Sequence, residues 1–306
     1  MKAVRRDILK LIQTYILKET DKSYTVFYQQ FLPSLKLLID DYKANAQDAR
    51  DPEVLHLFST MIKHMGEQLQ NELPIIYEGL CASTLAVVQN EFQLYPDFRE
   101  GFFTLVMNAI KHCTQGLFSL EQSTFHNIIL IVIFAMQHEK PELMDLGLQS
   151  MHAMTIILKE QPSLATDFYK YMYVQILRET LAVMIDYRHV SGFKMQAMIL
   201  QELLSACISG VIDPNCKLHD ENGQPHQMGS NRDFVCEYLA QNLQSQFANM
   251  NRVQIETFVL KLFNALADWT GFKETLRDLL ISMRSFASQN DEFYEEERQV
   301  SFSFVI

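Results

Sequence analysis

The tripeptides Asp51-Pro52-Glu53, Tyr95-Pro96-Asp97, Lys140-Pro141-Glu142 and Gln161-Pro162-Ser163 decide the fold of this chain. Each comes directly before a run of residues whose apolar positions recur with helical spacing. Proline is well tolerated at the first position of a helix, because the N–H group that it lacks would have no intrahelical acceptor there. We therefore expect each of these prolines to begin a helix.

The other four prolines fit the same picture. Pro33 and Pro74 each precede a long apolar run, whereas Pro214 and Pro225 fall in one polar loop. On this pattern all eight prolines mark helix boundaries or loops, and none needs to kink the interior of a helix.

Apolar residues within these runs recur every three to four positions, the spacing of one helix face. In the first run this face consists of Val4, Ile8, Leu11, Ile12, Tyr15 and Ile16. In a later run it consists of Phe193, Ala197, Leu200, Leu204, Cys207 and Val211. The alternation typical of strands is missing, so the sequence predicts an all-α chain of roughly twelve helices.

The helices group into pairs that begin near residues 4, 52, 97, 141, 191 and 254. These intervals exceed the roughly 33 or 34 residues of ankyrin and tetratricopeptide repeats, and they fit the longer two-helix HEAT repeat. We expect an α-solenoid of about six antiparallel HEAT-type pairs, wound as a right-handed superhelix over residues 1–290. The expected pairs are 4–45, 52–93, 97–138, 141–187, 191–249 and 254–288, with a loop insertion at 212–230. An acidic segment, 291–306, follows.

Neither end of this row carries the polar repeat that caps a solenoid, which favours a fragment of a longer array. We therefore expect exposed apolar faces on the terminal helices. The segment 291–306 is expected to be cut short for the same reason.

Composition narrows the function classes. Net charge is −11, from 37 acidic and 26 basic residues, and no basic cluster exceeds Arg5-Arg6. Nucleic-acid binding depends on concentrated positive charge, so a direct nucleic-acid partner is not expected, and an acidic solenoid favours a basic protein partner.

The longest apolar run, Ile128 to Met136, falls short of the roughly 20 residues of a membrane helix, so no membrane partner is expected. Five unpatterned cysteines favour a reducing compartment.

One loop carries residues with the spacing of metal ligands: Cys216, His219 and His226. Zinc takes four nitrogen or sulfur donors, and a fourth is not evident unless Asp213 or Asp220 serves. A surface insertion, with Asn222-Gly223 and Pro225 as turn residues, explains the loop better. We expect no metal and no cofactor. The phosphate-binding, nucleophile-elbow and zinc-protease motifs are all missing, so we do not expect an enzyme.

A series of short strings runs in order along nearly all of residues 1–300. They include Met1 to Ile12, Leu38 to Tyr42, Ala49 to Leu55, Tyr95 to Arg99, Phe272 to Asp278 and Glu295 to Arg298. In order and spacing they resemble the repeats in the C-terminal third of exportin one, the karyopherin-superfamily nuclear exportin that recognises leucine-rich export signals.

This resemblance implies a ring-like superhelix that carries cargo out of the nucleus while bound to the GTPase Ran in its GTP form. It implies shuttling between nucleus and cytoplasm, with nuclear pore proteins as further partners. The cleft for the export signal and the cysteine that covalent export inhibitors target lie N-terminal to the matched strings. No cysteine of this chain therefore inherits that role.

In the family, the second helices of the C-terminal repeats face Ran, which here implies Phe27 to Lys43 and Leu164 to Tyr187. From their places at the ends of these helices, Asp41, Lys43, Asp186 and Arg188 are the expected partner contacts; a solvated helix face is the alternative for each. The alternative for the whole chain is a HEAT scaffold or adaptor subunit of a cytosolic complex without a transport role.

Overall fold

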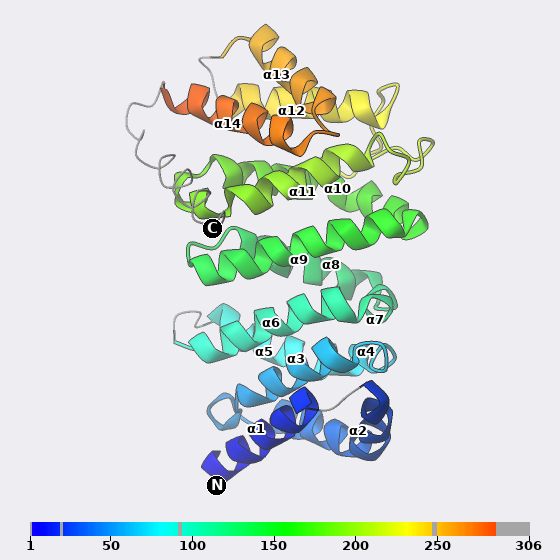
Figure 1. Ribbon diagram of the computed structural model, residues 1–306, viewed down its shortest axis with the longest axis vertical. Coiled ribbons are helices and arrows are strands. Elements are labelled where there is room, and N and C mark those ends of the chain that lie inside the picture. Colours follow the sequence, from blue (N-terminus) through cyan, green and yellow to red (C-terminus); the bar gives the residue numbers. More distant parts are fainter. Residues whose placement is uncertain (1, 19–20, 91–93, 247–249, 286–306) are drawn as a thin grey trace, which may run out of the picture. The chain divides into compact units, whose positions relative to one another are not determined.

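A computed structural model describes residues 2–18, 21–90, 94–246 and 250–285, and most of this part of the chain is helical (Figure 1). The α-helices are α1 (Lys2–Lys18), α2 (Asp21–Ala44), α3 (Glu53–Met65), α4 (Leu73–Ile76), α5 (Ala82–Asn90), α6 (Pro96–His112), α7 (Thr114–Phe118), α8 (Gln122–Met136), α9 (Pro141–Glu160), α10 (Pro162–Ile185), α11 (Phe193–Ala206), α12 (Asn231–Gln246), α13 (Arg252–Asn264) and α14 (Trp269–Ser285). Two 3-10 helices, η1 (Gln47–Ala49) and η3 (Tyr187–Gly192), and a π-helix, η2 (Tyr77–Cys81), complete them.

The all-α prediction is confirmed. The described residues contain fourteen α-helices, more than the roughly twelve expected, because the second helices of two pairs are each divided into two α-helices. One becomes α4, η2 and α5, and the other becomes α7 and α8. None of the described helices is both long and apolar enough to cross a bilayer. The expected acidic segment 291–306 lies outside the described residues.

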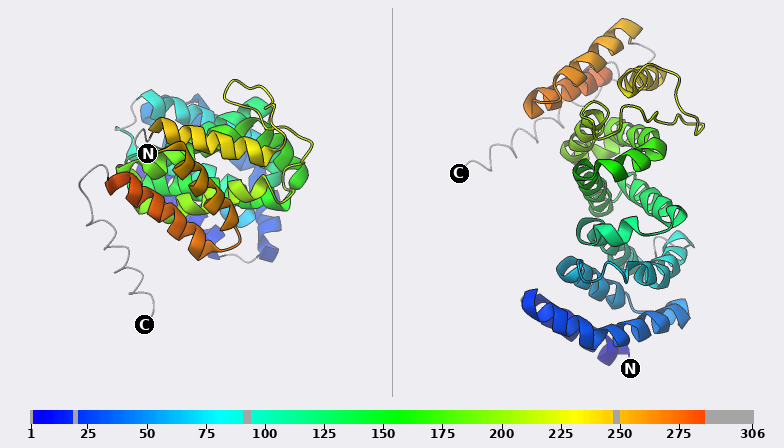
Figure 2. Two further views of the ribbon diagram at one scale, coloured as in Figure 1. Left: turned by 90° about the horizontal axis from the view of Figure 1, so that it is seen from above. Right: turned by 90° about the vertical axis from the view of Figure 1, so that its right-hand side faces the viewer.

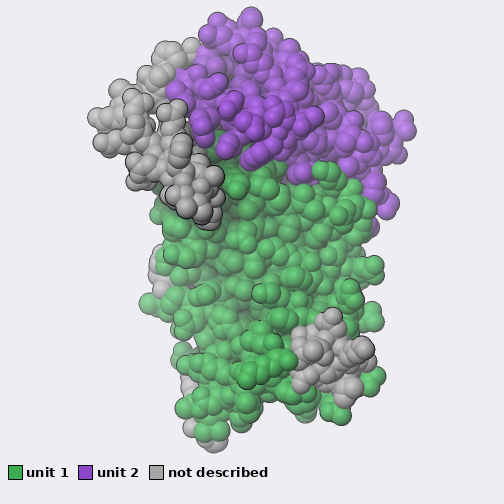
Figure 3. All heavy atoms as spheres, viewed as in Figure 1, with its two compact units in different colours: residues 1–161, 186–199 green, residues 162–185, 200–306 purple. Residues whose placement is uncertain are grey.

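The chain divides into two compact units, shown in different colours in Figure 3. The first comprises Met1–Gln161 and Asp186–Ile199, and the second comprises Pro162–Ile185 and Leu200–Ile306.

In the first unit, helices α1, α3, α6 and α9 pack one on the next and form a layer (Figures 1 and 2). Helices α2, α5 and α8 pack against α3, α6 and α9 and belong to a second layer. Helix α3 lies between neighbours, and its Leu55, Leu57, Met61 and Ile62 are completely buried. Each such side chain stabilises the fold by about 1.5–3 kcal/mol through removal of apolar surface from water.

The second layer departs from α-helical geometry at η2. A Cβ atom on Gly79 would lie 2.1 Å from Cγ2 of Ile39, so only glycine fits where η2 packs against α2. A short π-helical segment adds a residue to one turn and locally shifts the helix face. The hydroxyls of Tyr42 and Thr84, both completely buried, lie 2.8 Å apart beside this contact.

Most prolines lie where the sequence predicts. Helices α6, α9 and α10 begin at Pro96, Pro141 and Pro162, and α3 begins at Glu53, directly after Pro52.

Pro33 is the exception, because it lies inside α2. The prediction that Pro33 marks a helix boundary is therefore wrong. A proline at position 33 leaves the carbonyl of Gln29 without its helical donor. Both residues are exposed, so water can take the place of that donor.

The predicted face of α1 also needs correction. Val4, Ile8, Leu11 and Tyr15 are 47–69% exposed, whereas Leu9 and Ile16 are buried. Helix α1 is apolar on more than one side, and the periodicity does not reveal which side packs on α3. The expected exposed apolar face is present on this helix. On α11, by contrast, Phe193, Ala197, Leu200 and Leu204 are buried as predicted.

In the second unit, α13 packs on α12 and α14 packs on α13. The loop between α11 and α12 lies along α10, to which the backbone N–H groups of Asp213 and His219 donate. Asn231 organises the loop: its Oδ1 accepts from the N–H of Leu218, and its Nδ2 donates to the carbonyl of Cys216. The expected turn is present, with Gly223 at a φ of 73°.

Candidate partner-binding site

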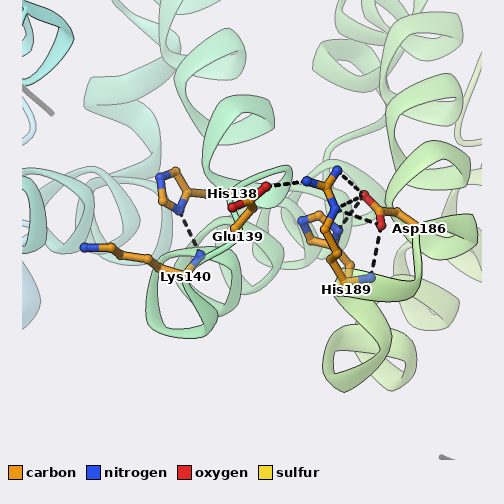
Figure 4. Close-up of polar contacts among 6 residues, drawn as sticks. His138, Glu139, Lys140, Asp186 and His189 are labelled. Carbon is orange, nitrogen blue, oxygen red and sulfur yellow. Dashed lines mark hydrogen bonds and ion pairs between the residues drawn. The ribbon is translucent and has the colours of Figure 1, made fainter. Parts of the chain in front are cut away.

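A cluster of charged side chains forms where two connections of the first unit meet (Figure 4). One connection joins α8 to α9 and carries His138, Glu139 and Lys140. The other follows α10 and carries Asp186, Arg188 and His189, of which the last two lie in η3. Arg188 donates through Nη1 to Oε1 of Glu139 and thereby links the connections.

The contact between Asp186 and Arg188 is the most complete of the cluster. Asp186 caps η3, since its Oδ1 accepts from the backbone N–H of Arg188 at 3.0 Å. The guanidinium donates to both carboxylate oxygens, with Nη2 2.7 Å from Oδ2. Hydrogen bonds from Arg188 lower the pKa of Asp186 to about 2, so this carboxylate is ionised at any physiological pH.

Two histidines lie beside these ions. His189 is 2% exposed, and its Nδ1 is 3.3 Å from Oδ2 of Asp186, within ion-pair distance. Nδ1 of His138 accepts from the backbone N–H of Lys140 at 2.9 Å. Burial, and secondly the charge of Arg99, lowers the pKa of His138. His138 is therefore neutral near pH 7 and positions the α8–α9 connection through a hydrogen bond.

The other two expected contacts lie at the end of α2. Asp41 accepts from Nη2 of Arg5 on α1, and Nζ of Lys43 donates to Oε1 of Glu78 at 2.8 Å. Lys43 and Glu78 have side chains 52% and 76% exposed. The hydrogen bond from Lys43 lowers the pKa of Glu78.

All four expected residues therefore form ion pairs within the chain, and about half of the side chain is exposed for Asp41, Lys43 and Arg188 but only 23% for Asp186. The structure joins Asp186 and Arg188 directly but gives Asp41 and Lys43 separate partners. Sequence reasoning missed Arg5, Glu78 and Glu139. Arg188 and Glu139 are 49 residues apart, close to one repeat, so an offset of one repeat from each candidate could have found Glu139.

The candidate metal ligands are not brought together. Among the described residues no group of three or more His, Cys, Asp or Glu side chains could hold a metal ion. His226 is engaged elsewhere: its Nδ1 accepts from the N–H of Met228, and its Nε2 lies 2.7 Å from Oδ1 of Asn231. The ring of His219 lies against that of Tyr171.

The cysteines have the character of packing residues. Burial raises the pKa of Cys113 and of Cys207 to about 12, and it also raises those of Cys81, Cys216 and Cys236. Reactive cysteines have lowered pKa values, because the thiolate is the nucleophile. All five thiols are therefore protonated at neutral pH.

Stacked helix pairs with charged connections define an α-solenoid protein of the HEAT type. Comparison with known proteins defines it further. The family model described as "CRM1 C terminal" matches residues 1–288, and the chain belongs to this family.

Three relatives show how much of a longer protein the match covers. The chain is 33% identical to Protein EXPORTIN 1B of Arabidopsis thaliana, over 97% of this chain and 27% of that protein. It is 30% identical to Exportin-1 of Dictyostelium discoideum, over 100% of this chain and 29% of that protein. It is 28% identical to Exportin-1 of Schizosaccharomyces pombe, over 98% of this chain and 28% of that protein. The chain thus spans under a third of the length of the curated relatives that it matches.

Proposed function

We propose that this chain is the C-terminal scaffold segment of a nuclear export receptor that carries cargo with leucine-rich signals out of the nucleus together with Ran-GTP. One observation carries the proposal: the match to the CRM1 C terminal family extends over residues 1–288, and the relatives matched along the chain are named as exportins. The segment contributes to Ran binding and ring closure. The signal cleft belongs to the part of the receptor that this chain does not match.

Ran contact is assigned to the cluster of Glu139, Asp186 and Arg188. Tyr187, at its edge, is 72% exposed, and Arg188 keeps 49% of its side chain exposed. Tyrosine and arginine are enriched among the residues that dominate binding at protein interfaces. A carboxylate on each side presents Arg188 in a fixed orientation, so less conformational entropy is lost on binding.

A second contact is assigned to Asp41 and Lys43 at the end of α2. Ring closure through further repeats is supported by α1, whose exposed stripe of Val4, Ile8, Leu11 and Tyr15 offers an apolar face to a neighbouring helix pair.

Charge supports the choice of partners. A net charge of −11 favours basic protein surfaces over nucleic acid, and no described helix could span a membrane. The receptor shuttles between nucleus and cytoplasm, and nuclear pore proteins are its further partners.

The test compares the binding of Ran-GTP and Ran-GDP to the full-length receptor that contains this segment. We expect a strong preference for Ran-GTP. Substitution Arg188→Glu places three carboxylates together and reverses the charge offered to Ran, so affinity for Ran-GTP should fall by roughly tenfold.

Arg252→Glu is the matched control. Arg252 also binds two carboxylates, those of Glu237 and Glu256, and its side chain is 39% exposed, but it lies on α13. Its substitution should change the affinity by less than about twofold. Equal losses in both variants would remove the assignment to Arg188. A full-length receptor without preference for Ran-GTP would refute the export role itself and favour the scaffold of a non-transport complex.

A further inference from the structure

The C-terminal ends of α3 and α6 line a polar cavity of about 730 Å³ in the first unit, and this cavity is open to solvent. Lys63 and His64 reach it from the last turn of α3, and Lys111 and His112 reach it from the last turn of α6. The turn from Gly66 to Gln70 and the start of α7 complete the lining.

Backbone contact holds the two helix ends together. A Cβ atom on Gly66 would lie 1.9 Å from the carbonyl oxygen of His112, so only glycine fits at position 66. Oε1 of Gln70 accepts from the N–H of Gly116 at 2.5 Å and fixes the turn against α7. The cavity wall is therefore built from fixed elements.

The two lysines that line this cavity have no matching carboxylate among the described residues. Within the described part of the chain neither Lys63 nor Lys111 forms an ion pair; Nζ of Lys111 lies 3.4 Å from the amide oxygen of Gln149. Glu67, which is exposed, is the one carboxylate among the lining residues. With two lysines and one glutamate, the cavity lining carries a net positive charge in a chain whose net charge is −11.

The basic groups also disfavour the charged forms of two of their neighbours. Burial, and secondly the charge of Lys63, lowers the pKa of Lys111. Burial, and secondly the charge of Lys111, lowers the pKa of His112, to which Lys63 and His64 contribute further. An anion in the cavity would relieve this repulsion.

Basic residues in the last turn of a helix also interact favourably with the helix dipole. That role accounts for the basic residues of each helix separately, but it does not require the residues of both helices to line the same cavity. Their repulsion across the cavity is unfavourable, and interaction with the helix dipoles does not explain why they lie so close together.

We propose that this cavity, lined by Lys63, His64, Lys111 and His112, is a docking site for an acidic peptide segment of a partner protein. Carboxylate side chains spaced along a peptide can form charge-assisted hydrogen bonds with ammonium groups from both helices at once. The volume of the cavity is in the range that holds several side chains and is large for a single small anion. This site is independent of the Ran contact proposed above.

The test uses a fluorescently labelled peptide of consecutive glutamates and the purified full-length receptor, with binding followed by fluorescence anisotropy. The double substitution Lys63→Glu and Lys111→Glu should reduce affinity by roughly tenfold, because attraction at two positions becomes repulsion. The control, Lys36→Glu with Lys194→Glu, changes the net charge equally at two exposed positions that do not line the cavity. It should reduce affinity by less than about twofold.

Glu67→Gln removes the carboxylate from the cavity lining and should tighten binding by about twofold. A misfolded variant would bind more weakly, so misfolding cannot account for such a gain. Equal losses in the double variant and its control would overturn the proposal, because the effect would then reflect net charge alone. It would also be overturned if inorganic phosphate competed as well as the unlabelled peptide, which indicates a small-anion site. Tighter binding of a single-stranded oligonucleotide than of the peptide would likewise refute it.

Discussion

Two connections of the first unit each contain an arginine and an aspartate, but these residues have different roles in the two places. The connection from α2 to α3 contains Arg50 and Asp51, and the connection after α10 contains Asp186 and Arg188. Asp51 is 2% exposed and accepts both from Arg6 and from the N–H of Glu53. Arg50 lies over the ring of Tyr42 and donates to four backbone carbonyls. These carbonyls belong to Tyr42, Lys43, Asn45 and Ser83.

Arg188, by contrast, donates to carboxylates and to no other acceptor among the described residues, and about half of its side chain faces solvent. An arginine that satisfies main-chain carbonyls holds the end of a helix in place. One that is held by carboxylates at the surface keeps part of its guanidinium accessible to a partner. The location of its acceptors therefore indicates whether an arginine in a helix connection is architectural or available for binding.

The largest expected difference is in stability. Arg50→Ala removes four charge-assisted hydrogen bonds to carbonyls at the end of α2, and we expect it to lower the free energy of unfolding by about 3 kcal/mol. Chemical denaturation of the chain measures the loss. Hydrogen exchange of the amides around residues 42–50 should show faster local opening. The comparison fails if Arg50→Ala leaves both measurements unchanged.

A smaller effect on stability is expected at the second connection. Arg188→Ala breaks exposed ion pairs, which contribute little because solvent screens them, so the denaturation midpoint should shift far less than in Arg50→Ala. A midpoint shift as large as that of Arg50→Ala would show that both connections are architectural.

The smallest expected effect is the contribution of Asp186 to acid stability. Its pKa is about 2 in the folded chain and has an ordinary value of 3.8. Because the folded value is the lower, the contribution is fully present above the ordinary value and is lost as the pH falls toward 2. Acid unfolding of the wild type and of Arg188→Ala should therefore differ slightly at pH 5 and converge near pH 2. A difference that grows below pH 3 would contradict this assignment.

Much of the fold could be predicted from prolines and periodicity. Pro96, Pro141 and Pro162 begin helices because fixed φ and a missing donor suit that position. Pro33 shows the limit of the rule, since an exposed helix interior tolerates the same residue. Which face of α1 is buried could not be predicted. Its apolar residues surround much of the helix, and only the position of α3 decides which of them are buried.

Less of the candidate site was accessible to sequence reasoning. Asp186 and Arg188 were found from their place at a helix end. Glu139 could be found only by knowing that the connection between α8 and α9 lies beside the connection after α10. That pairing depends on the length of one repeat, and the five intervals between the predicted pair starts are unequal and do not define it. The cavity between α3 and α6 was missed for the same reason, since Lys63 and Lys111 are neighbours only across a repeat.

The loop between α11 and α12 bears on how such a protein can lengthen during evolution. Its turn closes on Asp220, whose Oδ1 accepts from the N–H groups of Asn222 and Gln224, and its base is joined by Asn231. Extra residues that satisfy their own main chain in this way do not disturb the stacking of neighbouring repeats. A repeat array can therefore acquire new surface at one position while its overall register is inherited unchanged.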